Sequence, residues 1–322
     1  MKIFISGGAG FIGSHMATKM LKLYRDVAVV IYDNFSSGTL AHLHELLNDS
    51  RLTVVEGDIK HLGMLTNAMA SADLVIHFAA NPDIAKAVKQ PDIDFWEGTY
   101  LTQNILEAMR INNVKKLLYT SGSGVYGEVP NEEFTESFGP CFPISTYGAS
   151  KLACEALISS YCHMFSIKAR AFRFANVVGS KQTHGVGYDF IRRLLANPKS
   201  LRILGDGTQS KSYIHVEDVL NAMLMVYGAS ENSTQSFDVF NVATDDYISV
   251  TEIADIACEV ANLRCSDVDY QYTGGDRGWK GDVPKVLFNV EKIKKLGWIA
   301  TKNSRQAIKD SINSMKKEIQ GT

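Results

Sequence analysis

The chain has 322 residues, 45% of them hydrophobic, which is enough to bury the core of one large α/β domain or two joined lobes. The formal net charge of −2, the lack of a basic run and the lack of an apolar run of ~18 residues argue against nucleic acid and membranes as partners. The five cysteines are scattered without metal-ligand spacing, so we expect reduced thiols, no metal site and a cytoplasmic protein without a signal peptide.

The first stretch of the chain predicts a phosphate-binding turn. The apolar run Ile3–Ile5 is typical of a buried strand; glycines follow at Gly7, Gly10 and Gly13, and an amphipathic helix begins near Phe11. Glycines permit a tight turn and close approach of a pyrophosphate, and the N–H groups of the helix N-terminus face the anion. The glycine spacing alone is common, so the prediction depends on its place between a strand and a helix.

Strand and helix patterns alternate through the first half of the chain. The further predicted strands are Val27–Tyr32, Leu52–Val55, Leu74–Phe78, Lys116–Thr120 and Ala169–Phe174. The predicted helices are Leu40–Leu47, Leu62–Met69, Ile93–Ile111 and Tyr147–Met164. This alternation predicts an α/β fold with a doubly wound parallel sheet and helices on both faces.

After Asn176 the alternation loosens, and segments rich in glycine and charge separate short elements. The segment 237–242 is apolar enough to return to the sheet as a further strand. We therefore predict a dinucleotide-binding Rossmann domain at 1–175 and a smaller α/β substrate lobe at 176–322. Ligands of open α/β sheets bind outside the carboxyl ends of the strands, so the lobe is expected to close over that edge.

Two aspartates end predicted strands and are candidate cofactor ligands. Asp33 ends the second strand, where its carboxylate can accept hydrogen bonds from a ribose diol. No arginine follows in 34–38 to pair with a 2′-phosphate, which favours NAD over NADP. Asp33 could instead initiate a turn. Asp58 ends the third strand, and could either bind adenine beside Ile59 or cap the following helix.

Tyr147 and Lys151 lie four residues apart at the start of a predicted helix and therefore share one face. A lysine ammonium beside a phenol stabilises the phenolate and makes it a general acid and base. Such a pair by itself is more often an ordinary surface pair. It gains weight here from the dinucleotide turn earlier in the same chain.

Several motifs occur in a fixed order along the chain. They are Gly7-x-x-Gly10-x-x-Gly13, Asp33-Asn34, Asp58, His77-Phe78-Ala79-Ala80, Val125-Tyr126-Gly127, Tyr147-x-x-x-Lys151, Arg173-Phe174-Ala175-Asn176 and Gly205-Asp206-Gly207-x-Gln209. This order resembles the extended short-chain dehydrogenase/reductase superfamily, and within it NAD-dependent nucleotide-sugar epimerases of the UDP-glucose 4-epimerase type. The resemblance covers nearly the whole chain.

The resemblance implies an activity, a cofactor and partners. Tyr147 takes the proton from the C4 hydroxyl of a UDP-hexose, and NAD receives the hydride. The transient 4-keto sugar then rotates on its diphosphate, so that the hydride returns to its other face. The implied partners are a nucleotide sugar and a second copy of the chain. The homodimer would form through the helix at 93–111 and the helix that carries Tyr147.

The resemblance also implies contacts for individual residues. Cofactor contacts are implied for Gly7, Gly10, Phe11, Ile12, Asp33, Asn34, Ser37, Asp58, Ile59, Phe78, Ala79, Ala80, Tyr147 and Lys151. Substrate contacts are implied for Ser121, Ser123, Tyr147, Asn176, Leu201, Ile203, Lys211, Arg277 and Val286. Lys211 replaces an arginine that binds phosphate in relatives, so it keeps the charge and loses the bidentate fork.

Three positions depart from the family pattern. Gly122 stands where relatives carry a serine or threonine that binds the reacting hydroxyl; Ser121 and Ser123 flank it, and Ser123 is the preferred catalytic replacement. Gly98 stands where relatives carry asparagine. Trp279 stands where they carry an arginine near the C-terminus. These departures leave open a divergent epimerase, a different substrate or an attenuated enzyme.

Other functions and a specificity hypothesis remain open. Val286 is smaller than the tyrosine of galactose-selective relatives, which leaves room for an N-acetyl group on C2 of the sugar. A 4,6-dehydratase would carry Asp-Glu where this chain has Ser123-Gly124. A UDP-glucuronate epimerase or decarboxylase is a further alternative, as is a non-catalytic NAD and nucleotide-sugar-binding regulator. His77, in an apolar run, is expected to be a satisfied core histidine.

Overall fold

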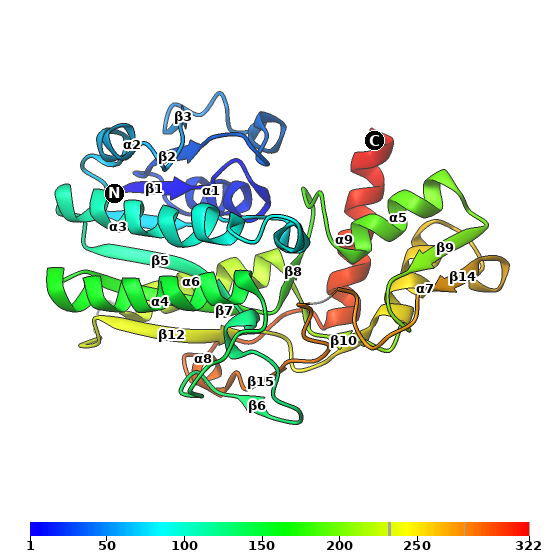
Figure 1. Ribbon diagram of the computed structural model, residues 1–322. Helices are drawn as coiled ribbons and strands as arrows, with labels where there is room; N and C mark the ends of the chain where they lie inside the picture. The colour runs from blue at the N-terminus through cyan, green and yellow to red at the C-terminus, as the bar shows by residue number, and fades with distance from the viewer. Residues whose placement is uncertain (231–232, 280, 322) are drawn as a thin grey trace. The chain divides into compact units, whose positions relative to one another are not determined.

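The computed structural model describes residues 1–230, 233–279 and 281–321. The chain divides into two compact units (Figure 1). Unit 1 contains residues 1–125, 141–173 and 223–240, and unit 2 contains 126–140, 174–222 and the chain from Asn241 onward. This division differs from the single boundary predicted at 175/176. The segment 223–240 belongs to unit 1 because it leads into a strand of the sheet.

Unit 1 is built on a seven-stranded sheet of order β12-β7-β5-β4-β1-β2-β3. Its strands are β1 (Lys2–Ser6), β2 (Ala28–Asp33), β3 (Leu52–Glu56), β4 (Leu74–His77), β5 (Lys116–Gly122), β7 (Lys168–Phe174) and β12 (Phe237–Val242). The pairings of β1 with β2 and β4, of β2 with β3 and of β4 with β5 are parallel. The predicted parallel sheet and the returning strand at 237–242 are confirmed.

Helices cover both faces of this sheet. They are α1 (Phe11–Leu23), α2 (Leu62–Met69), α3 (Tyr100–Ile111), α4 (Thr146–Phe165) and the second half of α6 (Val216–Ala229). The helices α2, α3 and α4 share one core with alternate sheet residues such as Phe4, Val75 and Leu117. Figure 1 shows α3 and α4 side by side across one face. The helix α1 packs on β1 and β2, where Ile3 and Ile5 point away from that core.

Two predicted helices of unit 1 differ from the observed elements. The predicted helix at 93–111 contains a π-helical segment, η3 (Phe95–Thr99), directly before α3. The predicted helix at 40–47 is only a 3₁₀ turn, η1 (Leu40–Leu43), which Thr39 caps. So short a segment gains too few backbone hydrogen bonds to offset the cost of starting a regular helix. Two further 3₁₀ turns are η2 (Ile84–Val88) and η4 (Ser123–Tyr126).

Unit 2 combines short strand pairs with several helices. The strand pairs are β8 (Asn176–Val178) with β11 (Tyr213–His215), β9 (Ser200–Ile203) with β14 (Asp269–Tyr272), β10 (Ser210–Lys211) with β13 (Ile248–Ser249), and β6 (Glu133–Phe134) with β15 (Leu287–Phe288). The helices are α5 (Val186–Ala196), α7 (Val250–Val260), α8 (Glu291–Lys294) and α9 (Ser304–Gln320), with the 3₁₀ turn η6 (Cys265–Asp267). The helices α5, α7 and α9 enclose a core that includes Ile191, Ile253 and Ile308.

The remaining bulk predictions concern membranes and thiols. No helix within the described residues is both long and apolar enough to cross a bilayer. All five cysteines are free, as the scattered spacing predicted. The described residues contain no cluster of three or more histidine, cysteine or acidic side chains that would hold a metal ion.

Candidate functional site

In the glycine turn between β1 and α1, side chains at Gly7 and Gly13 would collide with the protein backbone. Gly7 adopts φ +68°, and a Cβ there would lie 2.7 Å from the backbone nitrogen of Ala79. A Cβ on Gly13 would lie 2.3 Å from the carbonyl oxygen of Gly7. Gly10 is the N-cap residue of α1, and no side chain caps this helix end. The first-turn N–H groups of α1, including those of Phe11 and Ile12, are therefore available to an anion.

Asp33 connects the end of β2 to this turn. It is 8% exposed, and its two carboxylate oxygens accept the backbone N–H groups of Ala9 and Phe35, each at 2.9 Å. Burial raises the pKa of Asp33 above its ordinary value, while these two hydrogen bonds act in the opposite direction. A carboxylate has about four acceptor sites, so two remain for the hydroxyls of a ribose.

The other predicted adenosine-side residues lie at the ends of β2 and β3. Asn34 donates to Asp58 at 3.4 Å, and Ser37 is exposed two residues beyond Phe35. Asp58 accepts the backbone N–H of Lys60 at 2.8 Å, but it does not cap α2, whose N-cap residue is His61. The alternative interpretation of Asp58 as a helix cap is therefore wrong.

The segment after β4 completes the cofactor side of unit 1. Phe78 donates its backbone N–H to the carbonyl of Ser6 at 3.0 Å, and Ala79 and Ala80 continue past the glycine turn. Ile59 is 5% exposed and packs into the unit 1 core, so only its backbone can face a ligand. All predicted cofactor residues of β1 to β4 thus lie near the carboxyl ends of neighbouring parallel strands.

Tyr147 and Lys151 lie on the first two turns of α4. Lys151 is 5% exposed; its Nζ donates to the carbonyl of Thr120 at 2.7 Å and lies 5.5 Å from the ring centroid of Tyr147. The same Nζ lies 5.0 Å from the ring centroid of Tyr119, whose buried phenol has a pKa well above its usual range. Among the described residues, the half-buried Tyr147 has no hydrogen-bond partner for its hydroxyl. That hydroxyl is free to meet a ligand.

The end of β5 supplies the residues around Gly122. Ser121 is 5% exposed and donates its hydroxyl hydrogen to Glu155 at 2.6 Å, and Glu155 also forms a buried bidentate ion pair with Arg173. The Ser121 hydroxyl is therefore committed to this network. Ser123 makes no side-chain hydrogen bond within the described chain. A Cβ on Gly122 would meet no atom within 4 Å.

His77 lies at the end of β4 and is 1% exposed. Its Nδ1 is 2.7 Å from the hydroxyl oxygen of Ser6, and its Nε2 is 3.1 Å from that of Thr102. Burial, followed by the charge of Lys151, lowers the pKa of His77 to about 3. The prediction of a satisfied core histidine is confirmed.

The predicted phosphate-binding cations of unit 2 each have a carboxylate partner. Lys211 on β10 pairs with Asp282, which also accepts the backbone N–H of Gly278 at 3.3 Å. Arg277 forms a bidentate pair with Glu128, at 3.2 and 3.3 Å, and also contacts Asp276. These hydrogen bonds raise the pKa of Arg277 further, so it stays charged.

The other predicted substrate residues of unit 2 differ in exposure. Asn176 begins β8, is exposed and donates its amide to the carbonyl of Ser212 at 3.2 Å. Leu201 and Ile203 on β9 are fully buried in the unit 2 core, so only their backbone can face a ligand. Val286 is 8% exposed just before β15.

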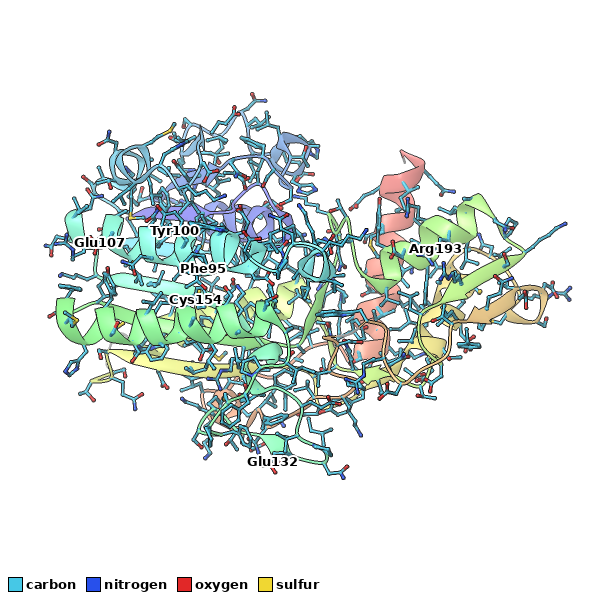
Figure 2. All side chains as sticks on the ribbon, in the orientation of Figure 1. Phe95, Tyr100, Glu107, Glu132, Cys154 and Arg193 are labelled. Carbon is cyan, nitrogen blue, oxygen red and sulfur yellow. The ribbon has the colours of Figure 1, made fainter. Side chains whose placement is uncertain are left out.

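Sequence reasoning missed the polar groups that hold α4 in place. Glu155 lies four residues after Lys151, on the face that Tyr147 and Lys151 share, and this spacing was a usable signal. Asp94 is 1% exposed within an apolar helix pattern, and its hydrogen bond to Thr146 could not be inferred from spacing. The labelled side chains Phe95 and Tyr100 in Figure 2 mark the segment that follows Asp94.

Comparisons with known proteins identify a family and several similar proteins. Residues 3–243 match the model of the NAD dependent epimerase/dehydratase family. A relative from Methanocaldococcus jannaschii, which carries a provisional UDP-glucose 4-epimerase name, is 32% identical over 98% of both chains. A crystal structure of a UDP-galactose 4-epimerase matches with a TM-score of 0.87 and 35% identity, over 99% of this chain and 100% of that one.

A third similar protein differs in its sugar. It is a UDP-N-acetylglucosamine 4-epimerase from Methanobrevibacter ruminantium, solved with UDP-N-acetylmuramic acid, with a TM-score of 0.83 and 27% identity over 100% of this chain and 99% of that one. The family match, the confirmed parallel sheet and the uncapped glycine turn all point to the same family. The chain belongs to the NAD dependent epimerase/dehydratase family.

Proposed function

We propose that this chain is an NAD-dependent epimerase that inverts C4 of a UDP-hexose. The observation that carries the proposal is the pairing of Tyr147 with Lys151. The Tyr147 hydroxyl has no partner within the described protein, while the Lys151 ammonium is fixed 5.5 Å from the Tyr147 ring. A phenol held in this way is suited to remove a proton from a sugar hydroxyl and to return it.

The residues of unit 1 suit the cofactor. Gly7, Gly10 and the first turn of α1 would hold the pyrophosphate, since no side chain caps this helix end and its N–H groups are available to an anion. Asp33 would bind the adenosine ribose, and Lys151 the nicotinamide ribose. When bound, NAD would supply reversible hydride transfer at C4 of the sugar.

The chain's own groups would handle the proton. Tyr147 would accept the proton of the C4 hydroxyl, and Lys151 would stabilise the resulting phenolate through its charge. Lys151 can hold this place because the carbonyl of Thr120 accepts one of its hydrogens at 2.7 Å. Ser123 would bind the reacting hydroxyl, because the Ser121 hydroxyl is already committed to Glu155.

Unit 2 would bind the nucleotide of the substrate. Asn176 would reach the diphosphate, and the backbone at Leu201 and Ile203 would meet the uracil, since both side chains are buried. Lys211 and Arg277 would contact the phosphates by exchanging part of their present carboxylate contacts.

The test of the proposal is Tyr147→Phe in the full-length protein. Loss of the phenol hydroxyl should lower kcat for UDP-glucose or UDP-galactose at least 100-fold, because general acid–base catalysis contributes ~10²–10⁴-fold. NAD content, measured by mass spectrometry of the purified protein, should stay at the wild-type level. The control is Tyr24→Phe, an exposed tyrosine just after α1. Wild-type activity in Tyr147→Phe would refute the proposal.

The same assay separates the competing reactions. A 4,6-dehydratase would release a product lighter by one water, and a decarboxylase acting on UDP-glucuronate would release CO2. The positions of Ser123 and Gly124, where dehydratases carry Asp-Glu, favour epimerisation over water loss. A protein that binds NAD and UDP-sugars but converts none of them would be a regulator.

Val286 is the proposed determinant for N-acetylated sugars. Its small side chain would leave room for the acetamido group of UDP-GlcNAc, whereas Val286→Tyr would crowd it. The variant should lower kcat/KM for UDP-GlcNAc at least tenfold more than for UDP-glucose. An equal loss for the two substrates would remove this assignment.

A further inference from the structure

Asp94 is a buried carboxylate that the proposed reaction does not use directly. It is 1% exposed and precedes the π-helical segment η3. Among the described residues no cation forms an ion pair with it, and its partners are neutral donors. Its Oδ1 accepts the amide of Asn81 at 2.8 Å, and its Oδ2 accepts the hydroxyl of Thr146 at 2.7 Å. A buried polar group whose hydrogen bonds are satisfied in this way is costly to disturb.

The first partner belongs to the segment after β4. Asn81 is 5% exposed and follows Ala79 and Ala80, the residues that pass the glycine turn. Its own conformation is fixed locally, because its Oδ1 accepts the backbone N–H of Asp83 at 3.0 Å and its Nδ2 donates to the Asp83 carbonyl at 3.0 Å. Asp94 therefore holds a segment that is already rigid.

The second set of partners belongs to α4. Thr146 directly precedes Tyr147, and Ser150 directly precedes Lys151. Thr146 donates to the Asp94 carboxylate, and Ser150 donates to the Asp94 backbone carbonyl at 2.7 Å. Residues four apart lie on one face of a helix. Asp94 thus contacts α4 twice, at the positions next to Tyr147 and Lys151. Two such contacts restrain both the rotation of the helix about its axis and its position along that axis.

Gly98 and the π-helical segment make the second contact possible. A Cβ on Gly98 would lie 2.4 Å from the hydroxyl oxygen of Ser150. The absent side chain leaves space for that hydroxyl, which is also 2.9 Å from the hydroxyl oxygen of Thr99. A π-helical turn commonly marks a functional position because it displaces the residues around it. Gly98 therefore leaves the space in which the Ser150 hydroxyl donates to the carbonyl of Asp94.

We propose that Asp94 is a positioning residue, which holds the segment after β4 and the turn of α4 that carries Tyr147 in one geometry. This inference rests on the proposed epimerase function for its kinetic consequence. A displacement of about 1 Å at reacting groups can cost about 100-fold in rate. Loss of the Asp94–Thr146 bond should therefore lower kcat while leaving substrate binding largely intact.

The kinetic test uses an isosteric pair at the position beside Tyr147. Thr146→Val removes the hydroxyl and should lower kcat about tenfold or more with KM changed less than about threefold. Thr146→Ser restores the hydroxyl and should recover most of that loss. The matched control is Thr66→Val on α2, which removes a comparable hydroxyl that donates to the Leu62 carbonyl at 2.7 Å. Equal kcat values for Thr146→Val and Thr66→Val would overturn the proposal.

A second measurement is independent of turnover. Asp94→Asn weakens the side-chain hydrogen bonds with Asn81 and Thr146. Hydrogen exchange should therefore become faster in peptides covering 79–83 and 145–152, and Thr66→Val should leave exchange in both peptides unchanged. If Asp94→Asn does not fold, Thr146→Val is measured in its place over 145–152. Unchanged exchange there would overturn the proposal. A wild type that converts no UDP-hexose would refute the proposed function alone, and exchange would still decide the role of Asp94.

Discussion

Gly98 and Gly122 both stand where the family pattern has a polar residue, yet their surroundings are opposite. A Cβ on Gly98 would lie 2.4 Å from the Ser150 hydroxyl oxygen, whereas a Cβ on Gly122 would meet no atom within 4 Å. Neither glycine has a positive φ, so backbone strain requires glycine at neither position. A side chain at Gly98 must displace the Ser150 hydroxyl, whereas one at Gly122 displaces no atom.

The two glycines lie in two different surroundings of α4, which we call its supporting side (near Gly98) and its open side (near Gly122). On the supporting side, polar groups are bonded to one another, as in the contacts of Asp94 with Thr146 and of Ser121 with Glu155. On the open side, the hydroxyls of Tyr147 and Ser123 have no partner within the described residues. Changes on the first side should therefore affect stability and the placement of α4, and changes on the second should affect the chemical step directly.

The largest expected effect on stability concerns His77 and pH. His77 is neutral when folded, with a pKa of about 3, but it binds a proton below about pH 6.5 once unfolded. Its contribution is therefore fully present above pH 6.5 and is lost as pH falls toward 3. The free energy of unfolding should fall by about 2 kcal/mol between pH 6.5 and 4.5 because of this group. Urea titrations should give a shallower pH dependence for His77→Gln, and identical slopes would contradict the expectation.

A loss of similar size is expected when Gly98 is replaced by the asparagine of relatives. The new side chain must displace the Ser150 hydroxyl, and overpacking of this kind costs about 1–3 kcal/mol. Thermal melts should show a fall in Tm of several degrees for a chain of this size.

A double-mutant cycle identifies the cause. Gly98→Ala should destabilise the wild type but not a Ser150→Ala background, where the atom 2.4 Å away is absent. Equal effects in the two backgrounds would show that the Ser150 hydroxyl is not what excludes a side chain at Gly98.

On the open side, Ser123→Ala should lower kcat by about tenfold, the effect of losing one hydrogen bond of about 1.4 kcal/mol to the reacting hydroxyl. The same substitution in a Gly122→Ser background should cost much less, because the family position then supplies a hydroxyl. Initial rates of UDP-galactose conversion measure both. An equally large loss in that background would show that a serine at position 122 does not take over the role of Ser123.

The smallest expected effect is the change in stability caused by Gly122→Ser. No atom lies within 4 Å of the new Cβ, so the free energy of unfolding should change by less than about 0.5 kcal/mol. A drop as large as that of Gly98→Asn would end the distinction between the two glycines.

The sequence allowed most of unit 1 to be predicted. Apolar runs such as Ile3–Ile5 are buried on both faces of the sheet, and their spacing with helices repeats along the chain. The positions of Asp33, Tyr147 and Lys151 followed from the ends of these elements. The π-helical segment at Phe95–Thr99 was not predictable from local spacing, and the hydroxyl partner of its Thr99 is Ser150, more than 50 positions away.

Unit 2 was less predictable for physical reasons. Its strands are only two to four residues long, so alternation of side chains gives little signal. The helix α5 follows a glycine-rich stretch and was not predicted. Besides its neighbour Asp276, Arg277 pairs with the distant Glu128, and Lys211 pairs with the distant Asp282; charge alone does not identify these distant partners.

The central claim is inversion at C4 of a UDP-hexose, and an isotope experiment tests it most directly. Purified protein is incubated with UDP-galactose carrying deuterium at C4, and the products are analysed by NMR and mass spectrometry. The proposed function predicts UDP-glucose that retains the deuterium at C4 in the inverted configuration. A product lighter by one water, deuterium lost to solvent, or no inversion with NAD bound would contradict it.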